Sequence, residues 1–292
     1  MNWTAVLLLV LPVAICAQDA RATTLAQVRE RGFLVAGVVD EASPFGGVAD
    51  GKAGGFDAAL IEALGKSVPI EIRQQPIAPG DLANALGSGK VDIVASSVEI
   101  TAPGQRAVSY ISPVAEATRY YLKRKGDDRI RTISDLADKG FGFRASSHSS
   151  MELTEFEHHL AKTGGALGEG HEYPTYREAA KALIDKQVDY VVGDIADLQM
   201  AVREKPNDLE IGDAVSQKIY VAWATAKNSP ELAGLVTGFL DQQRKSGELQ
   251  ALQQKFLGRP FPDLPETVDA KDWWAARDKP KVFPIPSIKD PD

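Results

Sequence analysis

From Thr23 onward, short apolar runs alternate with stretches in which apolar residues recur every three or four positions. The runs are typical of buried strands, and the stretches are typical of helices with one apolar face. We expect strands at 33–39, 70–75, 91–95, 117–122, 141–143, 190–192 and 219–224, and helices between them at 56–64, 79–86, 151–160, 176–185 and 195–202. This regular alternation predicts an α/β fold with mostly parallel sheets.

The pattern becomes wholly helical after the last expected strand. Apolar residues form one stripe over 232–240 and a second over 249–257, with Gly247 between them. From 259 to 292 the chain is rich in proline, which disfavours regular structure. We expect this last segment to be a tail that packs over the surface.

The first 22 residues have the order of a secretory signal. An apolar run over 5–17 precedes Ala20-Arg21-Ala22, a small-residue cleavage site. The run is shorter than the roughly 20 residues that a membrane-spanning helix needs, so an uncleaved anchor fits it less well. No Lys or Arg precedes the run, and Cys16 offers a lipidated start as an alternative, although Ile15 is bulkier than such a site prefers. We expect cleavage and release into the periplasm.

Composition and charge exclude several classes of protein. With 292 residues, 44% of them hydrophobic, the chain is long enough for two domains with cores of their own. A net charge of −7, a pI near 5.3 and the lack of a basic run argue against a nucleic-acid partner. Cys16 is the only cysteine, so the cleaved chain would have no disulfide, thiol nucleophile or cysteine metal ligand. We expect no metal and no cofactor.

Several sequence blocks follow one another in a fixed order. They are RGFLVAGV at 31–38, GGFD at 54–57, GKVDI at 89–93, DYVVGD at 189–194 and KFLG at 255–258. Each block alone is weak, but their order and spacing resemble the periplasmic amino-acid-binding proteins, the family-3 extracellular solute-binding components of ABC transporters. The resemblance extends from Thr24 to Gly258.

The resemblance implies a two-lobed periplasmic-binding-protein-like fold of type II, with a ligand held between the lobes. Lobe 1 would comprise 23–122 and 220–258, and lobe 2 would comprise 123–219, with hinges near 121–124 and 217–220. The protein would be a monomer that closes on a small polar metabolite and delivers it to a membrane permease. Ligands of open α/β sheets gather beyond the carboxyl ends of the strands, which agrees with this placement.

The family's charge clamp would be formed by Arg106 and Asp194. The resemblance implies that Arg106 binds the ligand carboxylate and Asp194 its ammonium group, roles that suit a guanidinium fork and a carboxylate. The turn between Thr101 and Arg106 is two residues longer than is usual in the family. Arg106 could therefore be a solvated helix residue instead.

Polar residues around this clamp complete the expected site. Ser96, Ser97 and Thr101 would supply hydroxyl and amide groups, although such residues also serve as caps. Glu99 would favour a more cationic ligand if it faces the cleft. Phe45 is the only ring near stretches where the family often has an aromatic cage, which leaves amino-acid derivatives and other small acids open.

A polar run in the second lobe precedes the expected helix at 151–160. Ser147, His148 and Ser149 would place free N–H groups and the positive end of a helix dipole next to an anionic ligand group. An ordinary N-cap is the simpler interpretation of any one of these residues. Arg144, just before them, is a second candidate for an anionic group.

Two other functions remain open at this point. Cyclohexadienyl dehydratases have the same fold, and Asp197 stands where such an enzyme has its acidic residue, although a longer Glu is expected there. No nucleophile with an adjacent base is evident, so we expect no chemistry on the ligand. An accessory or sensory binding protein that is not coupled to transport would have the same sequence features.

Overall fold

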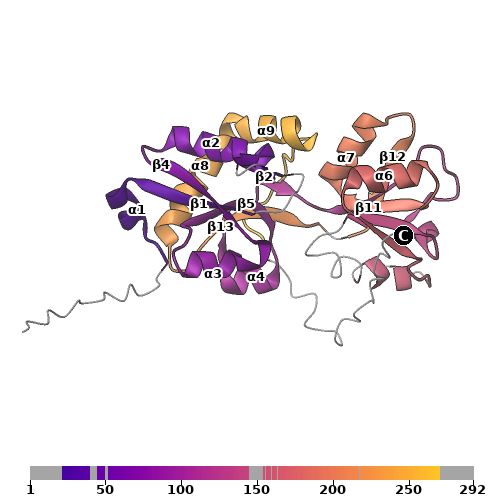
Figure 1. The fold of residues 1–292 in the computed structure, drawn as a ribbon, viewed down its shortest axis with the longest axis horizontal. Coiled ribbons are helices and arrows are strands. Elements are labelled where there is room, and N and C mark those ends of the chain that lie inside the picture. Colours follow the sequence, from indigo (N-terminus) through magenta and orange to yellow (C-terminus); the bar gives the residue numbers. More distant parts are fainter. Residues whose placement is uncertain are drawn as a thin grey trace, which may run out of the picture.

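Two mixed sheets organise the computed structural model, which describes residues 22–39, 45–49, 52–144, 154, 156–158, 160–162, 164–216 and 218–269. The sheets form the centres of two bodies joined by extended chain (Figure 1). Among the residues described, no helix combines the length and apolar character needed to cross a membrane.

The first sheet has the strand order β4-β1-β5-β13-β6, and β7 also pairs with β13. Its strands are β1 (Phe33–Val39), β4 (Glu71–Ile77), β5 (Ile93–Glu99), β6 (Ser109–Tyr110), β7 (Ala115–Glu116) and β13 (Tyr220–Thr225). The helices of this body are α1 (Leu25–Arg31), α2 (Gly55–Ser67), α3 (Leu82–Gly87), α4 (Ala102–Ala107), α8 (Pro230–Ser246) and α9 (Glu248–Leu257), with the short helix η1 (Pro79–Asp81) before α3. A small hairpin of β2 (Gly47–Ala49) and β3 (Lys52–Gly54) precedes α2.

The second sheet has the order β10-β9-β11-β8-β12. Its strands are β8 (Arg119–Arg124), β9 (Phe141–Arg144), β10 (Gly170–Tyr173), β11 (Tyr190–Asp194) and β12 (Leu209–Ala214). The short helix η2 (Ile133–Leu136) and the helices α6 (Tyr176–Ile184) and α7 (Ile195–Glu204) belong to this body. Figure 1 shows α6 and α7 on one side of this sheet.

Parallel pairing is confined to the strands that alternate with helices. In the first sheet β1 pairs in parallel with β4 and β5, and in the second β9 does so with β10 and β11. The strands next to the crossings between the bodies, β8 and β13, pair only antiparallel with their neighbours. Both sheets are therefore mixed, whereas mostly parallel sheets were expected.

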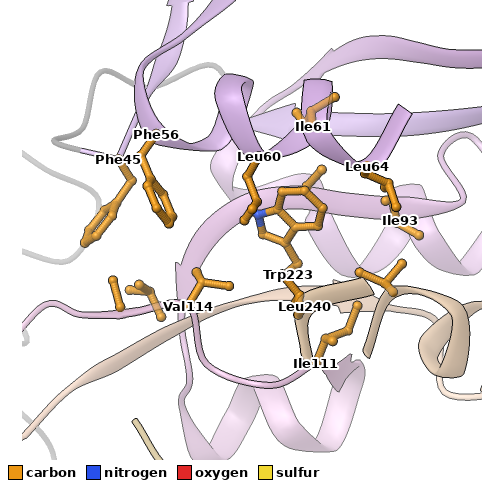
Figure 2. Close-up of a cluster of buried hydrophobic side chains, with 14 of the residues drawn as sticks. Phe45, Phe56, Leu60, Ile61, Leu64, Ile93, Ile111, Val114, Trp223 and Leu240 are labelled. Atoms are coloured by element: carbon orange, nitrogen blue, oxygen red, sulfur yellow. The ribbon is translucent and has the colours of Figure 1, made fainter. Parts of the chain in front are cut away.

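The core of the first body is centred on Trp223, which is fully buried. Phe56, Leu60 and Leu64 lie one helical turn apart on α2; Leu60 and Leu64 lie above Trp223, Phe56 lies beside Phe45, and Leu240 of α8 packs below (Figure 2). The spacing of these α2 residues is the reason why one face of the helix docks on the sheet. The indole Nε1 of Trp223 donates a hydrogen bond of 3.0 Å to Asp57, which connects the core to the polar edge of the sheet.

The second body has an aromatic core. Phe141 of β9 stacks on Tyr190 of β11 at 5.5 Å between ring centroids, and Phe156 meets both rings edge-on. Phe141 and Tyr190 are register partners in the parallel pair of β9 and β11, so the pairing itself brings the rings together.

The chain crosses between the bodies twice, after β7 and before β13, and the two crossings bond to each other. Ala117 N–H donates to Ile219 O at 2.9 Å, and Arg119 N–H donates to the Ser216 hydroxyl at 3.0 Å. Val215 N–H in turn donates to Arg119 O at 2.9 Å. The crossings therefore form one hydrogen-bonded strip at the base of the gap between the sheets.

The described part of the tail packs against the first body. Phe261 is buried, and its N–H donates to Gln253 of α9 at 2.8 Å. Further along, Gln105 of α4 donates to Val268 O at 2.5 Å. The segment from 259 to 269 therefore runs from α9 to α4.

Candidate functional site

A cleft of about 310 Å³ lies where the two sheets face each other. Its walls come from the ends of β1, β5 and β11, from the helices α3 and α4, and from the crossings. Among the residues predicted for the site, those that line it are Phe45, Ser96, Ser97, Glu99, Thr101, Arg144 and Asp194. The structure thus brings together residues of both bodies that are about 100 positions apart in sequence.

Three charged side chains form the base of this cleft. Arg119, the first residue of β8, is buried, and its guanidinium bonds to Asp194 through Nη1 and to Glu99 through Nη2. Glu99 ends β5 in the first sheet, and Asp194 ends β11 in the second. We name Glu99, Arg119 and Asp194 the ion triad; it joins the two bodies through side chains.

Asp57 adds a third carboxyl group, which is more deeply buried than those of Glu99 and Asp194. It is buried, and burial raises its pKa to about 6, although hydrogen bonds from Trp223 and Ser97 act in the opposite direction. Ser97 donates to it twice, from its N–H at 2.8 Å and from its hydroxyl at 2.7 Å. Asp57 therefore fixes the conformation of the strand end that carries Ser97 and Glu99.

Among the hydroxyl groups predicted to meet a ligand, those of the three described residues have partners within the chain. Ser96 Oγ accepts a hydrogen bond from Val39 N–H at 2.9 Å, and Ser97 is bound to Asp57. Thr101 caps α4 by accepting from Gly104 N–H at 3.1 Å. Each of these side chains shapes the wall of the cleft, and its contact with a ligand stays a prediction.

Arg106 lies outside the cleft in this structure. The longer turn after Thr101 forms the helix α4, on which the side chain of Arg106 is exposed and the neighbouring Gly104 and Ala107 line the cleft instead. A Cβ atom on Gly104 would stand 2.0 Å from the hydroxyl of Tyr110. Gly104 therefore allows the backbone of α4 to approach the phenol, and no arginine of α4 lines the cleft.

The second body contributes Arg144 and Tyr176 to the wall. Arg144 ends β9, with its guanidinium 5.5 Å from the centroid of the Tyr176 ring, in the range of a cation–π contact. Tyr176 in turn packs on Gly193, where a Cβ atom would be 2.3 Å from the ring. The predicted residues Ser147, His148 and Ser149 lie outside the described residues.

Asp197 borders a different cavity. This second cavity, of about 840 Å³, lies between α6 and α7 and shares Arg144 and Tyr176 with the cleft. Burial raises the pKa of Asp197 to about 6, although the charges of Arg144 and Arg119 lower it. One carboxyl oxygen of Asp197 is shielded from solvent and accepts no hydrogen bond.

Sequence reasoning missed Arg119, Tyr110 and Tyr176 as members of the wall. A signal for Arg119 was present, because it is a charged residue inside the expected strand at 117–122, among apolar and aromatic neighbours. A buried charge needs a partner of opposite sign, and the triad supplies two.

Comparison with known proteins identifies solute-binding proteins as relatives by sequence and by structure. The model of the bacterial extracellular solute-binding proteins, family 3, matches residues 34–259. The amino-acid-binding protein AabA of Dichelobacter nodosus is 26% identical over 70% of this chain and 80% of its own length. Two solved structures are of one ancestral amino-acid-binding protein, which is described as binding cationic amino acids and as a precursor of cyclohexadienyl dehydratase. They are 26% and 25% identical to this chain, cover 80% of it and all of their own length, and have TM-scores of 0.67 and 0.63.

An enzyme is also among the relatives. The membrane-bound lytic murein transglycosylase F of Pseudoalteromonas translucida is 24% identical over 85% of this chain. The chain spans about half the length of that protein, since the match covers 52% of it. The similarity is therefore to one part of a longer enzyme.

Proposed function

Because the chain belongs to the bacterial extracellular solute-binding proteins of family 3, we propose that it captures a small polar metabolite, an amino acid or a close derivative, between two lobes. The lobes would correspond to the two bodies, with their boundaries at the crossings before β8 and before β13, whereas the sequence placed the first boundary within β8, at 122/123. Ligand binding would close them by rotation about the two crossings. The proposal assigns no chemistry on the ligand to this chain.

The observation that supports this proposal is the ion triad at the base of the cleft. Glu99 and Asp194 come from different sheets and converge on Arg119, so the cleft offers paired charges of both signs to a ligand. A zwitterion can exchange its hydration shell for such groups, whereas a purely apolar ligand would leave them without a new partner. Relatives named for amino acids fit the same class.

Delivery to an ABC permease from the periplasm is the cellular role that we propose. The expected signal at 1–22 and the extracellular family support an exported protein. Transport and sensing use the same closure of the lobes, so a direct assay is needed. Uptake of the identified ligand, labelled with an isotope, should fall in cells that lack the gene and return when it is restored.

A lyase of the dehydratase type is the second candidate. The observation in its favour is Asp197, whose pKa of about 6 would keep it largely protonated in mildly acidic solution. Asp197 borders the second cavity and not the cleft, which disfavours it as an acid acting on a ligand in the cleft. Release of carbon dioxide from a cyclohexadienyl acid, lost in Asp197→Asn, would establish the lyase and overturn our proposal.

Native mass spectrometry of the purified protein tests the binding role without a prior choice of ligand. We expect a co-purified compound of low mass that carries both an ammonium and an acidic group. Calorimetry with the identified compound should then give one site per chain, and Asp194→Asn should weaken binding at least about tenfold. Binding that is unchanged by this substitution would contradict the site.

A further inference from the structure

The ion triad has two carboxylates and one guanidinium in a place with little water. The side chains of Glu99, Arg119 and Asp194 are 17%, 5% and 11% exposed. Charges with this degree of burial are weakly screened, so each depends on its partners more than a surface ion pair does. A ligand group that enters the triad has to share these charges with the partners that are already there.

The position of Arg119 is fixed by the crossings. Its N–H donates to Ser216 and its carbonyl accepts from Val215, which hold the backbone, and its Nη1 also donates to Ala117 O. Arg119 therefore belongs to the strip between the bodies. These bonds hold its guanidinium at the base of the cleft, where the two bodies meet.

A ligand ammonium that pairs with Asp194 has to compete with Nη1 of Arg119. If the same ligand carries a carboxylate, that group can accept the hydrogen bond that Asp194 gives up, and every buried charge keeps a partner. An amine without a carboxylate offers no such acceptor. The exchange therefore favours a ligand with both charges over one with the cation alone.

The sequence assigned the carboxylate to Arg106, and the geometry gives another candidate. Arg106 is exposed on α4 and does not line the cleft, whereas Arg119 is buried at its base and lines it. The two arginines also differ in their surroundings, because Arg119 already has a carboxylate from each sheet. The two assignments predict different outcomes for matched substitutions.

We propose that Arg119 is the residue that makes the cleft select for a ligand carboxylate, by exchanging its bond to Asp194 for one to the ligand. This inference rests on the proposed function of the cleft as a ligand-binding site. It adds Arg119, in the strip formed by the two crossings, as a residue that determines specificity. Arg119 was not one of the two predicted members of the charge clamp, Arg106 and Asp194. Arg119 receives the acidic group of the ligand, and Asp194 receives the ammonium group.

Matched pairs of compounds test the proposal. L-arginine with agmatine, L-lysine with cadaverine and L-histidine with histamine differ only by the carboxylate. Calorimetry would compare each pair on the wild-type protein and on Arg119→Lys, Arg119→Gln and Arg106→Gln. Arg119→Lys keeps a cation between Glu99 and Asp194 but lacks the planar fork, so it decides the matter if Arg119→Gln does not fold.

We expect the wild-type protein to bind at least one amino acid at least about tenfold more tightly than its amine, a difference typical of one charged hydrogen bond. This preference should collapse in the Arg119 variants and persist in Arg106→Gln. Loss of the preference in Arg106→Gln alone would overturn the inference and leave the binding function in place. Equal binding of acid and amine by the wild-type protein would do the same. Failure of all six compounds to bind would exclude cationic amino acids as ligands and overturn the inference for that class.

Discussion

At the scale of single residues, buried carboxyl groups carry the pH dependence of this molecule. The pKa of Asp197 is raised to about 6 by burial, from an ordinary value of 3.8. A carboxyl whose pKa is higher in the folded state contributes stability that is fully present below pH 3.8 and is lost as the pH rises through about 6. At pH 8 the folded state therefore bears the full cost of a buried charge.

Asp197→Asn should remove this cost. We expect the variant to be more stable than the wild type at pH 8 by up to about 3 kcal/mol, because a rise in pKa from 3.8 to about 6 corresponds to that free energy. The gain should vanish at pH 4, where both side chains are neutral in the folded state. Urea unfolding at the two pH values measures it, and the exposed Asp128→Asn is the control that should change stability at neither pH. A variant less stable than the wild type at pH 8 would contradict the prediction.

Trp223 contributes a hydrogen bond to Asp57 in addition to its burial in the core. Its Nε1 is one of the donors that hold Asp57, and Trp223→Phe would keep an aromatic ring and remove that donor. We expect a loss of about 1–3 kcal/mol at pH 8, where Asp57 is ionised, from the missing hydrogen bond together with the smaller ring. The loss should be smaller at pH 4, since a protonated Asp57 depends less on donors. An equal loss at both pH values would mean that the ring volume alone accounts for it.

At the scale of elements, the helix α4 is positioned by the absence of a side chain. Gly104 faces the Tyr110 hydroxyl at a distance that leaves no room for a Cβ atom. We expect Gly104→Ala to displace α4 from the cleft wall and to destabilise the protein by about 1–3 kcal/mol, as overpacking does. Gly80→Ala is the control, because Gly80 also lines the cleft and has nothing within 4 Å of an added Cβ. Chemical denaturation of both variants measures the difference, and equal stability would exclude the contact as a determinant of α4.

Alanine substitutions at a second pair of glycines distinguish the cost of backbone strain from the cost of disturbing a contact between the bodies. Gly247 and Gly258 both end helices with positive φ, at 80° and 86°, so alanine costs roughly 1 kcal/mol at either position from the backbone alone. Only at Gly258 would the new methyl group meet a neighbour, the guanidinium of Arg203 on α7 at 3.0 Å. Arg203 donates to Gly258 O at 2.8 Å, and α7 lies beside α9 in Figure 1.

Gly258→Ala should therefore cost more than Gly247→Ala and should also loosen the contact between α7 and α9. We expect small-angle scattering to give a changed radius of gyration for Gly258→Ala only, since this contact joins the two bodies. Arg203→Ala, which removes the same contact without backbone strain, should reproduce the change in scattering. Identical scattering from all variants would show that the contact does not restrain the bodies.

Element types followed from the sequence where the apolar pattern was strong. The expected strand at 33–39 is β1 to the residue, the stripes at 232–240 and 249–257 lie on α8 and α9, and the range 79–86 holds η1 and α3. Half of the expected helix at 151–160 falls outside the described residues. Strands β10 and β12 were missed because they lie at sheet edges, where half-exposed residues such as Gly170-His171-Glu172-Tyr173 give no apolar run.

The site was less predictable than the fold, for a reason that Arg106 and Arg119 illustrate. Spacing within a motif places a residue along the chain, but it does not say how an inserted turn folds or which way its side chains point. The residues after Thr101 form a helix that exposes Arg106. Arg119 reaches the cleft through pairing of β8 with β11, a contact between segments 75 positions apart that no local pattern encodes.

At the scale of the whole molecule, α7 ties the two bodies together. Its first residues, Ile195 and Ala196, are buried within the apolar cluster of the first body, although the helix belongs to the second. Leu198, on the same helix, packs in the core of the second body. The preceding residue, Asp194, is in the ion triad, so one helix connects the cleft, the first core and the second core.

This arrangement predicts that the two bodies unfold in one transition, and that truncation of a single side chain makes them unfold separately. Ile195→Ala should cost about 2–5 kcal/mol, as other buried truncations do, and should split a single urea transition into two, because the apolar link between the cores is weakened. Leu198→Ala should cost a similar amount yet keep one transition, since it weakens one core and leaves the link intact. Trp223 fluorescence, with the other three tryptophans replaced by phenylalanine, follows the first body, and far-ultraviolet circular dichroism follows both. Coincident transitions in Ile195→Ala would show that the covalent crossings and the ion triad are enough to couple the bodies.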